Sequence, residues 1–169
     1  MSTITNAGIH HLGLATHDME ATLTFYRDVL GFEMRVADVI QPQAGGQIRH
    51  AFLDAGSGEM VAFMECNDVK GIAADFDTGI NRGLGIAGGV MHFAFKSETE
   101  EALTARREDL LAKDVEVTDV VDHGWCKSIY FKDPNGLQLE FCTTTAAEFG
   151  AEHLVDADSD TWTALARPS

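Results

Sequence analysis

The stretch that decides the fold is Val121-Asp-His-Gly-Trp-Cys-Lys-Ser-Ile-Tyr-Phe-Lys-Asp-Pro-Asn-Gly-Leu-Gln-Leu-Glu140. It predicts a strand, a tight turn at residues 133–136 and a second strand, because Asp-Pro-Asn-Gly is a strong turn signal between β-rich segments. The second strand ends on the carboxylate of Glu140. Burial of an unpaired charge is costly. We therefore expect Glu140 to meet a cation or a hydrogen-bond donor.

Composition indicates a single domain that binds neither nucleic acid nor membranes. The chain has 169 residues, and 45% of them are hydrophobic, which is enough for a sizeable core. Its net charge of −15 argues against nucleic acid and anionic membrane surfaces. The three cysteines lack zinc-type spacing and indicate reduced thiols. With no signal peptide and no apolar run near the roughly 18 residues of a membrane span, we expect a cytoplasmic protein.

The sequence contains an internal repeat of strand, helix and three strands. His92 aligns with His11 without a gap, and each histidine opens the first strand of its copy. Asp18 caps the first helix, which runs to about residue 30, and the capping box Ser97-Glu-Thr-Glu100 opens the second, which runs to about residue 113. The first strand is expected at residues 9–15. The later strands are expected at residues 32–40, 47–53 and 60–66, and again at 115–121, 127–132 and 137–143.

The repeat predicts an α+β fold in one domain spanning residues 1–169. Module one covers about residues 7–67, a Gly-rich connecting loop about 68–88, module two about 89–144 and a C-terminal tail 145–169, with a short helix near 146–154. Two βαβββ modules bury their sheets by packing together, so we expect a partly closed mixed sheet around a shared metal cleft. We expect the chain to form a homodimer.

Three side chains form a candidate metal site. His11 and His92 begin equivalent strands, and Glu140 ends the last strand of the second copy. A single histidine in such a strand is more often a core residue, but two in register across a repeat favour a ligand role. In this topology the strands line the same cleft. Two imidazoles and one carboxylate suit Fe(II) or Mn(II) and leave positions open for substrate and dioxygen.

Residues 9–143 resemble the vicinal-oxygen-chelate superfamily. The stretches His11-Leu-Gly-Leu-Ala-Thr-His-Asp18 and Phe25-Tyr-Arg-Asp-Val-Leu-Gly-Phe32 are similar to its first-module pattern. The superfamily includes glyoxalase I, fosfomycin-resistance thiol transferases, methylmalonyl-CoA epimerase and type I extradiol dioxygenases. This part of the resemblance implies the fold and the first metal ligand, but not the reaction.

The second module carries a more specific motif. The spacing of His123, Tyr130 and Glu140 around the Asp-Pro-x-Gly turn resembles the extradiol ring-cleavage signature. The resemblance implies a metal held by His11, His92 and Glu140, with His123 and Tyr130 beside the bound catecholate and dioxygen. It thus implies cleavage of a catechol-like aromatic with one divalent metal. Fe(II) is preferred, and Mn(II), Ni(II) or Zn(II) are the other candidates.

Two alternatives remain open. Glu65 ends the fourth strand of the first copy, much as Glu140 ends that of the second, although a gapless alignment places Phe63 in this slot. With Glu65 as a fourth ligand, the resemblance implies a glyoxalase I- or epimerase-like lyase or isomerase, because two open positions suit proton transfer. The other alternative is a non-catalytic protein of the same fold that binds hydrophobic drugs.

Overall fold

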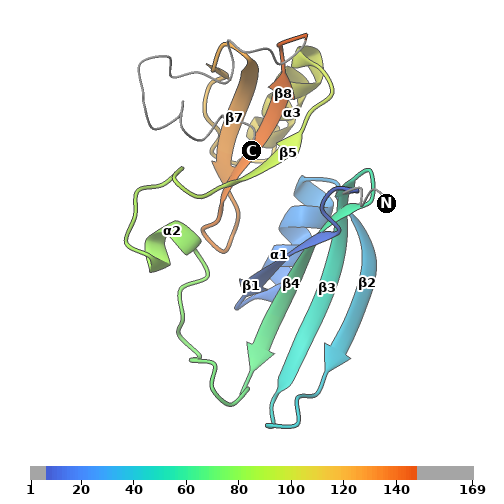
Figure 1. The fold of residues 1–169 in the computed structure, drawn as a ribbon, viewed down its shortest axis with the longest axis vertical. Helices are drawn as coiled ribbons and strands as arrows, with labels where there is room; N and C mark the ends of the chain where they lie inside the picture. Colours follow the sequence, from blue (N-terminus) through green and yellow to red (C-terminus); the bar gives the residue numbers. More distant parts are fainter. Residues whose placement is uncertain (1–6, 148–169) are drawn as a thin grey trace, which may run out of the picture.

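The computed structural model describes residues 7–147, which form two four-stranded mixed sheets with few helices (Figure 1). The elements are β1 (His11–Thr16), α1 (Met19–Leu23), η1 (Thr24–Val29), β2 (Glu33–Ile40), β3 (Gln47–Gly56), β4 (Glu59–Asn67), α2 (Ile80–Gly83), β5 (Phe93–Lys96), α3 (Glu100–Ala112), β6 (Val121–Asp122), β7 (Cys126–Lys132) and β8 (Gln138–Thr144). The strand orders are β1-β4-β3-β2 and β5-β8-β7-β6. The predicted α+β fold of two βαβββ modules is confirmed, but the two sheets are not joined. Most of the predicted C-terminal tail, with its short helix, lies outside the described residues.

The two predicted helices begin at side-chain caps. Asp18 accepts a hydrogen bond from the amide of Ala21 at 2.9 Å, as predicted, and the helix widens to π geometry after α1. The second helix begins at Glu100, where Thr99 accepts from the amide of Ala102 at 3.1 Å. The prediction that Ser97 opens this helix was therefore wrong, because the Thr99 hydroxyl satisfies the exposed amide.

The strand predicted at residues 115–121 is much shorter in the structure. Only β6 and an isolated bridge between Val117 and Phe131 remain. The Thr118 amide donates to the carbonyl of Tyr130 at 3.0 Å, but the Tyr130 amide donates to the Thr118 hydroxyl at 3.0 Å. A side-chain oxygen thus replaces the backbone carbonyl of a regular ladder, and the strand is interrupted.

Both sheets turn one face toward a common hydrophobic core. Phe25 of η1 lies against Phe131 of β7, with ring centroids 6.4 Å apart, and Phe32 lies 5.0 Å from Phe95 of β5. The side chains of a strand alternate between its two faces, so the neighbours of these core residues lie on the opposite face of each sheet. The core includes Leu14, Leu53, Val61, Phe63, Leu103, Leu110, Ile129, Leu139 and Phe141.

The turn at residues 133–136 fastens the β7–β8 hairpin to module one. One carboxylate oxygen of Asp133 accepts from the amide of Leu137 at 2.8 Å. The other accepts from the Tyr26 hydroxyl at 3.2 Å and the Asn135 side chain at 2.9 Å. Asn135 also donates to the Thr22 hydroxyl at 3.2 Å. The predicted turn is therefore a buried polar link between the modules.

The connecting segment docks on the same turn. Thr78 donates to the carbonyl of Asn135 at 3.0 Å, and the guanidinium of Arg82 lies against Gly136. Gly136 has φ +80°, and a Cβ there would lie 2.7 Å from an Arg82 nitrogen. The left-handed backbone conformation favours glycine at this position, and a larger side chain would also displace the Arg82 guanidinium.

The Asp133 link predicts a specific pH dependence of stability. Burial raises the pKa of Asp133 above its ordinary value, and the hydrogen bond from Asn135 offsets only part of that rise. The folded chain thus holds this proton more tightly than the unfolded chain does. The resulting stabilisation is complete below the ordinary carboxyl pKa and is lost as the pH rises through the folded-state pKa.

We expect the unfolding free energy of the wild type, minus that of Asp133→Asn, to fall as pH increases through this range. Urea unfolding across a pH series measures this difference, and a difference that increased with pH would contradict the assignment.

Candidate metal centre

Two of the predicted ligands, His92 and Glu140, lie in contact on the second sheet. His92 directly precedes β5, and β5 pairs with β8 so that Ala94 lies opposite Glu140. The Nε2 atom of His92 is 3.0 Å from a carboxylate oxygen of Glu140. Glu140 is only 4% exposed. His92 is therefore one of the partners expected for the buried carboxylate of Glu140.

The hydrogen bond at Nδ1 of His92 determines whether Nε2 carries a hydrogen in the neutral ring. Nδ1 is 2.9 Å from the carbonyl oxygen of Gly89, which can only accept, so Nδ1 carries a hydrogen. In the neutral ring, Nε2 then presents a lone pair to the Glu140 carboxylate. Two facing lone pairs at this distance require a proton or a cation between them. Ligand atoms about 2.1 Å from one metal ion and at right angles are about 3 Å apart, so the spacing fits coordination.

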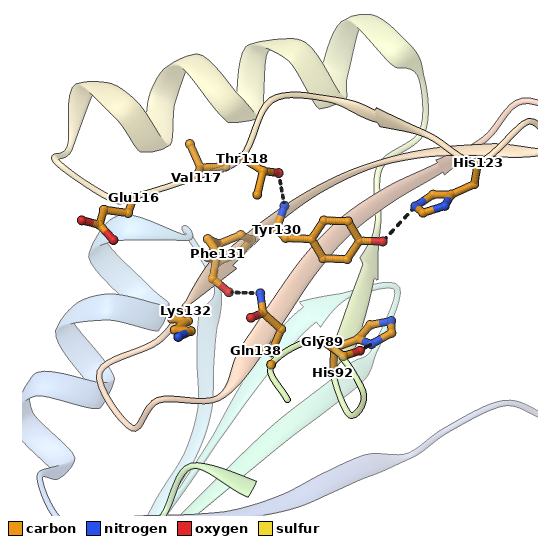
Figure 2. A pocket seen from close by; sticks show the side chains of 11 residues that line it. Gly89, His92, Glu116, Val117, Thr118, His123, Tyr130, Phe131, Lys132 and Gln138 are labelled. Atoms are coloured by element: carbon orange, nitrogen blue, oxygen red, sulfur yellow. Dashed lines mark hydrogen bonds between the residues drawn. The ribbon is translucent and has the colours of Figure 1, made fainter. Parts of the chain in front are cut away.

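His123 and Tyr130 form a second pair beside this one. Figure 2 shows the His123 ring directed at the Tyr130 hydroxyl, and Nε2 lies 2.9 Å from that oxygen. Tyr130 pairs with Glu140 across the β7–β8 ladder, and its ring centroid is 6.1 Å from that of His92. Burial raises the pKa of Tyr130, and the Glu140 carboxylate contributes to the rise. The hydroxyl therefore keeps its proton at neutral pH and can donate it in a hydrogen bond.

These side chains line an open hollow of about 760 Å³. His92, His123 and Tyr130 provide polar groups, Val117 also lines the hollow, and the Phe131 carbonyl there accepts a hydrogen bond from the Gln138 side chain at 2.9 Å (Figure 2). The volume lies within the range of small-molecule sites in proteins. The hollow can therefore hold an aromatic ring next to the His92–Glu140 pair.

His11 lies on the first sheet, apart from this group. It pairs with Met60 across the β1–β4 ladder, its Nδ1 is 2.8 Å from that of His10, and its ring lies 5.2 Å from that of Phe52. Within residues 7–147, no three histidine, cysteine, aspartate or glutamate side chains are grouped closely enough to hold a metal. The structure thus brings together His92, Glu140, His123 and Tyr130, and the three-ligand site remains a prediction.

Glu65 lies on the other face of the first sheet from His11. It pairs with Thr16, which alternates with His11 along β1 and is buried on the core side. One carboxylate oxygen accepts from the amide of Met19 at 3.1 Å, and the other from Arg49 at 3.1 Å. Helix α1 and strand β3 therefore hold this carboxylate on the core side.

The ladder registers also show which residue of β4 matches Glu140. Leu12 pairs with Val61 in the first sheet, as Phe93 pairs with Leu139 in the second. The equivalent of Glu140 is therefore Ala62, which has no ligand atom. The gapless alignment that placed Phe63 in this slot was therefore wrong by one residue, because the register depends on pairing across the sheet and not on periodicity along one strand.

The comparisons with known proteins agree with this architecture. Residues 8–141 match the Glyoxalase/Bleomycin resistance protein/Dioxygenase superfamily. The chain belongs to this superfamily. An iron-dependent extradiol dioxygenase from Rhodococcus jostii (strain RHA1) is 28% identical over 137 residues, which are 79% of this chain and 42% of that protein. The chain thus spans less than half the length of this superfamily relative.

Solved structures of superfamily proteins share the fold. A glyoxylase/bleomycin resistance protein/dioxygenase domain from Frankia sp. EAN1pec has a TM-score of 0.62 at 17% identity, covering 85% of this chain and 96% of that one. The lactoylglutathione lyase from Agrobacterium tumefaciens has a TM-score of 0.56 at 21% identity, covering 82% and 94%. At these identities the likeness shows the fold alone, and it confirms the fold predicted for this superfamily member.

The sequence analysis missed one contact that orients a candidate ligand of this superfamily member. The carbonyl of Gly89 orients His92, and the sequence signal for it is the glycine pair Gly88–Gly89, which Val90 and Met91 separate from the histidine. The three cysteines are free thiols, as predicted, and burial raises the pKa of Cys142 to about 11.

No helix of residues 7–147 is long and apolar enough to cross a membrane.

The position of Glu65 leads to a prediction that separates a structural role from a ligand role. Glu65→Gln replaces a charged acceptor of Arg49 and Met19 with a neutral amide, so we expect a loss of about 1–3 kcal/mol in unfolding free energy. Iron content after anaerobic loading should not change. Glu59→Gln, at the exposed start of the same strand, is the control. Loss of metal at unchanged stability would instead assign Glu65 as a ligand.

Proposed function

We propose that the chain is a metal-dependent extradiol-type dioxygenase that cleaves a catechol-like aromatic. The observation that carries the proposal is the Nε2 atom of His92 facing the Glu140 carboxylate, with Nδ1 engaged by Gly89. The His123–Tyr130 pair beside it supports oxygen chemistry on a hydroxylated ring. Membership of the superfamily, and 28% identity to an iron-dependent extradiol dioxygenase, support the reaction class.

The donor set fits the proposed metal. His92 and Glu140 would hold two of its positions and His11 the third, and two imidazoles with one carboxylate suit Fe(II). Mn(II), Ni(II) and Zn(II) are the other candidates. Bound Fe(II) would supply oxygen activation next to a chelated catechol. A metal-bound histidine commonly donates a hydrogen bond from its other ring nitrogen, and this bond fixes the orientation of the ring. Nδ1 of His92 makes such a bond to the carbonyl of Gly89.

The chain's own residues would bind the ring and move protons. The ring of Tyr130 and the side chain of Val117 line the hollow and offer apolar surface to the aromatic ring. A neutral imidazole has one nitrogen that accepts a proton and one that donates, so His123 can accept a proton from a catechol hydroxyl and return it. Tyr130 keeps its proton and donates a hydrogen bond, either to His123 or to a substrate oxygen. Its ladder position opposite Glu140 keeps it beside the metal ligands.

The geometry favours three protein ligands over four. A glyoxalase- or epimerase-like activity would use Glu65 as the fourth, but Glu65 faces the core and bonds to Met19 and Arg49. A drug-binding protein without a metal has no need of the His92–Glu140 donor pair. Neither alternative has an observation in its favour equal to the paired donors.

Anaerobic loading with Fe(II) tests the proposal. We expect about one iron per chain and, after admission of oxygen, a yellow ring-fission product from at least one member of a catechol panel. Iron-loaded protein that cleaved none of the catechols would overturn the dioxygenase assignment. Protein that bound no divalent metal would favour the drug-binding alternative.

Substitutions separate the ligand role from the proton-transfer role. His92→Ala should abolish iron binding, because it removes a ligand. His123→Phe should keep the iron and lower kcat by about a hundredfold or more, because the ring remains but proton transfer is lost. His17→Ala is the matched control, since His17 contacts the carbonyl of Phe76 away from the site. Full turnover by His123→Phe would contradict the proposed role of the His123–Tyr130 pair.

A further inference from the structure

The candidate hollow is much larger than the ring that the proposed reaction cleaves. It measures about 760 Å³. A cavity of about 150 Å³ is enough to hold benzene. Figure 2 shows His92 and His123 toward one end of the hollow, and Lys132 and Glu116 toward the other. A catechol held at the His92–Glu140 pair therefore leaves room for a substituent directed toward Lys132.

Lys132 lies on the same face of the second sheet as the donor pair. Tyr130 of β7 pairs with Glu140 of β8, and two residues farther along β7, Lys132 pairs with Gln138. Residues two apart in a strand share a face, so the two pairs lie side by side on one face. Lys132 and Gln138 both line the hollow. The ammonium group is therefore available to a molecule bound there.

His92 lies in the same row of the sheet as Lys132. Strand β5 runs parallel to β8 with Phe93 opposite Leu139, so the preceding residue, His92, is level with Gln138. Lys132 is on the far side of β8 in this row. Neighbouring strands are about 4.8 Å apart, so the backbones that carry His92 and Lys132 are roughly 10 Å apart. One benzene ring with a short side chain can therefore reach both the donor pair and the lysine.

The ammonium group of Lys132 is unpaired in the part of the chain that the structure describes. Most lysine and arginine side chains there form ion pairs, as Lys127 does with Glu100. Lys132 forms no ion pair and no side-chain hydrogen bond among residues 7–147, although the net charge of the chain is −15. A cation without a protein partner at the wall of a hollow can bind an anionic group of a ligand.

Glu116 also lines the hollow and carries the opposite charge. The bridge between Val117 and Phe131 places Glu116 beside β7, in the segment before β6. Strand β7, with Lys132, therefore lies between Glu116 and the strands β8 and β5 that position the donor pair. A substituent that extends from the donor pair meets Lys132 before it meets Glu116. The hollow thus favours a negative substituent over a positive one.

We propose that the substrate is a catechol whose substituent carries a carboxylate, and that Lys132 binds this carboxylate. The inference rests on the proposed function and names its substrate class. The ammonium group would donate charge-assisted hydrogen bonds, which are shorter and stronger than those between neutral groups. Lys132 would select the substrate without contacting the metal. Its replacement should therefore change which catechols bind, but not the iron content.

Carboxylated catechols and their methyl esters test the proposal, because each acid differs from its ester in charge while the catechol is the same. The probes are dihydroxyphenylacetate and dihydroxyphenylpropionate, and calorimetry without oxygen measures their binding to the Fe(II)-loaded protein. We expect the wild type to bind at least one acid about tenfold more tightly than its ester. Lys132→Met should lower the affinity for that acid to the affinity for the ester, whereas Lys132→Arg should keep the preference.

Lys127→Met is the matched control. Lys127 lies on the same strand, an odd number of residues from Lys132, so it faces away from the hollow, where it pairs with Glu100. This variant should keep the preference for the acid. Glu116→Gln should strengthen binding of the acid and leave binding of the ester unchanged, because it removes a like charge from the hollow.

Equal affinity of the wild type for acids and esters, or a preference that Lys132→Met retains, would overturn the inference. Weaker binding of the acid by Glu116→Gln would also contradict it. Turnover in oxygen separates these failures from that of the proposed function. Protein that cleaved uncharged catechols without preferring the acids would overturn the inference alone. Iron-loaded protein that cleaved neither would overturn the proposed function and the inference with it. Circular dichroism of each variant confirms folding before loading.

Discussion

The buried carboxylate of Asp133 joins the two halves of the molecule. It receives hydrogen bonds from Tyr26 of module one, from Asn135 in its own turn and from the amide at the start of the return strand. A buried carboxylate without such donors would be strongly unfavourable. The turn can therefore stay buried only while it is docked on η1. This docking places Phe131 against Phe25 and forms a single core from two modules.

The shared core determines where the chemistry lies. Strand side chains alternate, so burial of Ile129 and Phe131 on the core face puts Tyr130 on the opposite face, and burial of Leu139 and Phe141 does the same for Glu140. His92 enters the same face because Ala94 is in register with Glu140. A shift of the strand register by one residue would turn the side chains of His92, Tyr130 and Glu140 toward the core.

The same alternation separates the candidates for the remaining ligand. Glu65 and His11 lie on opposite faces of the first sheet, so they cannot serve one metal ion together. Glu65 instead accepts hydrogen bonds from helix α1 and strand β3, and His11 stays on the outer face. The outward-facing His11 of module one and the outward-facing His92–Glu140 pair of module two therefore lie on different sheets.

The sequence alone determined the two βαβββ modules and their turn, because periodicity and turn residues act over a few neighbouring positions. It grouped His123, Tyr130 and Glu140 only through the resemblance of their spacing to a family signature. It did not determine that Thr118 interrupts a strand, that Thr99 caps α3, or that Gly89 orients His92, since these depend on single hydrogen bonds. Nor did it determine the face of Glu65 or the separation of His11 from His92. Those were decided by the tertiary structure, because ladder register and the packing of one module on the other fix which side of each sheet is buried.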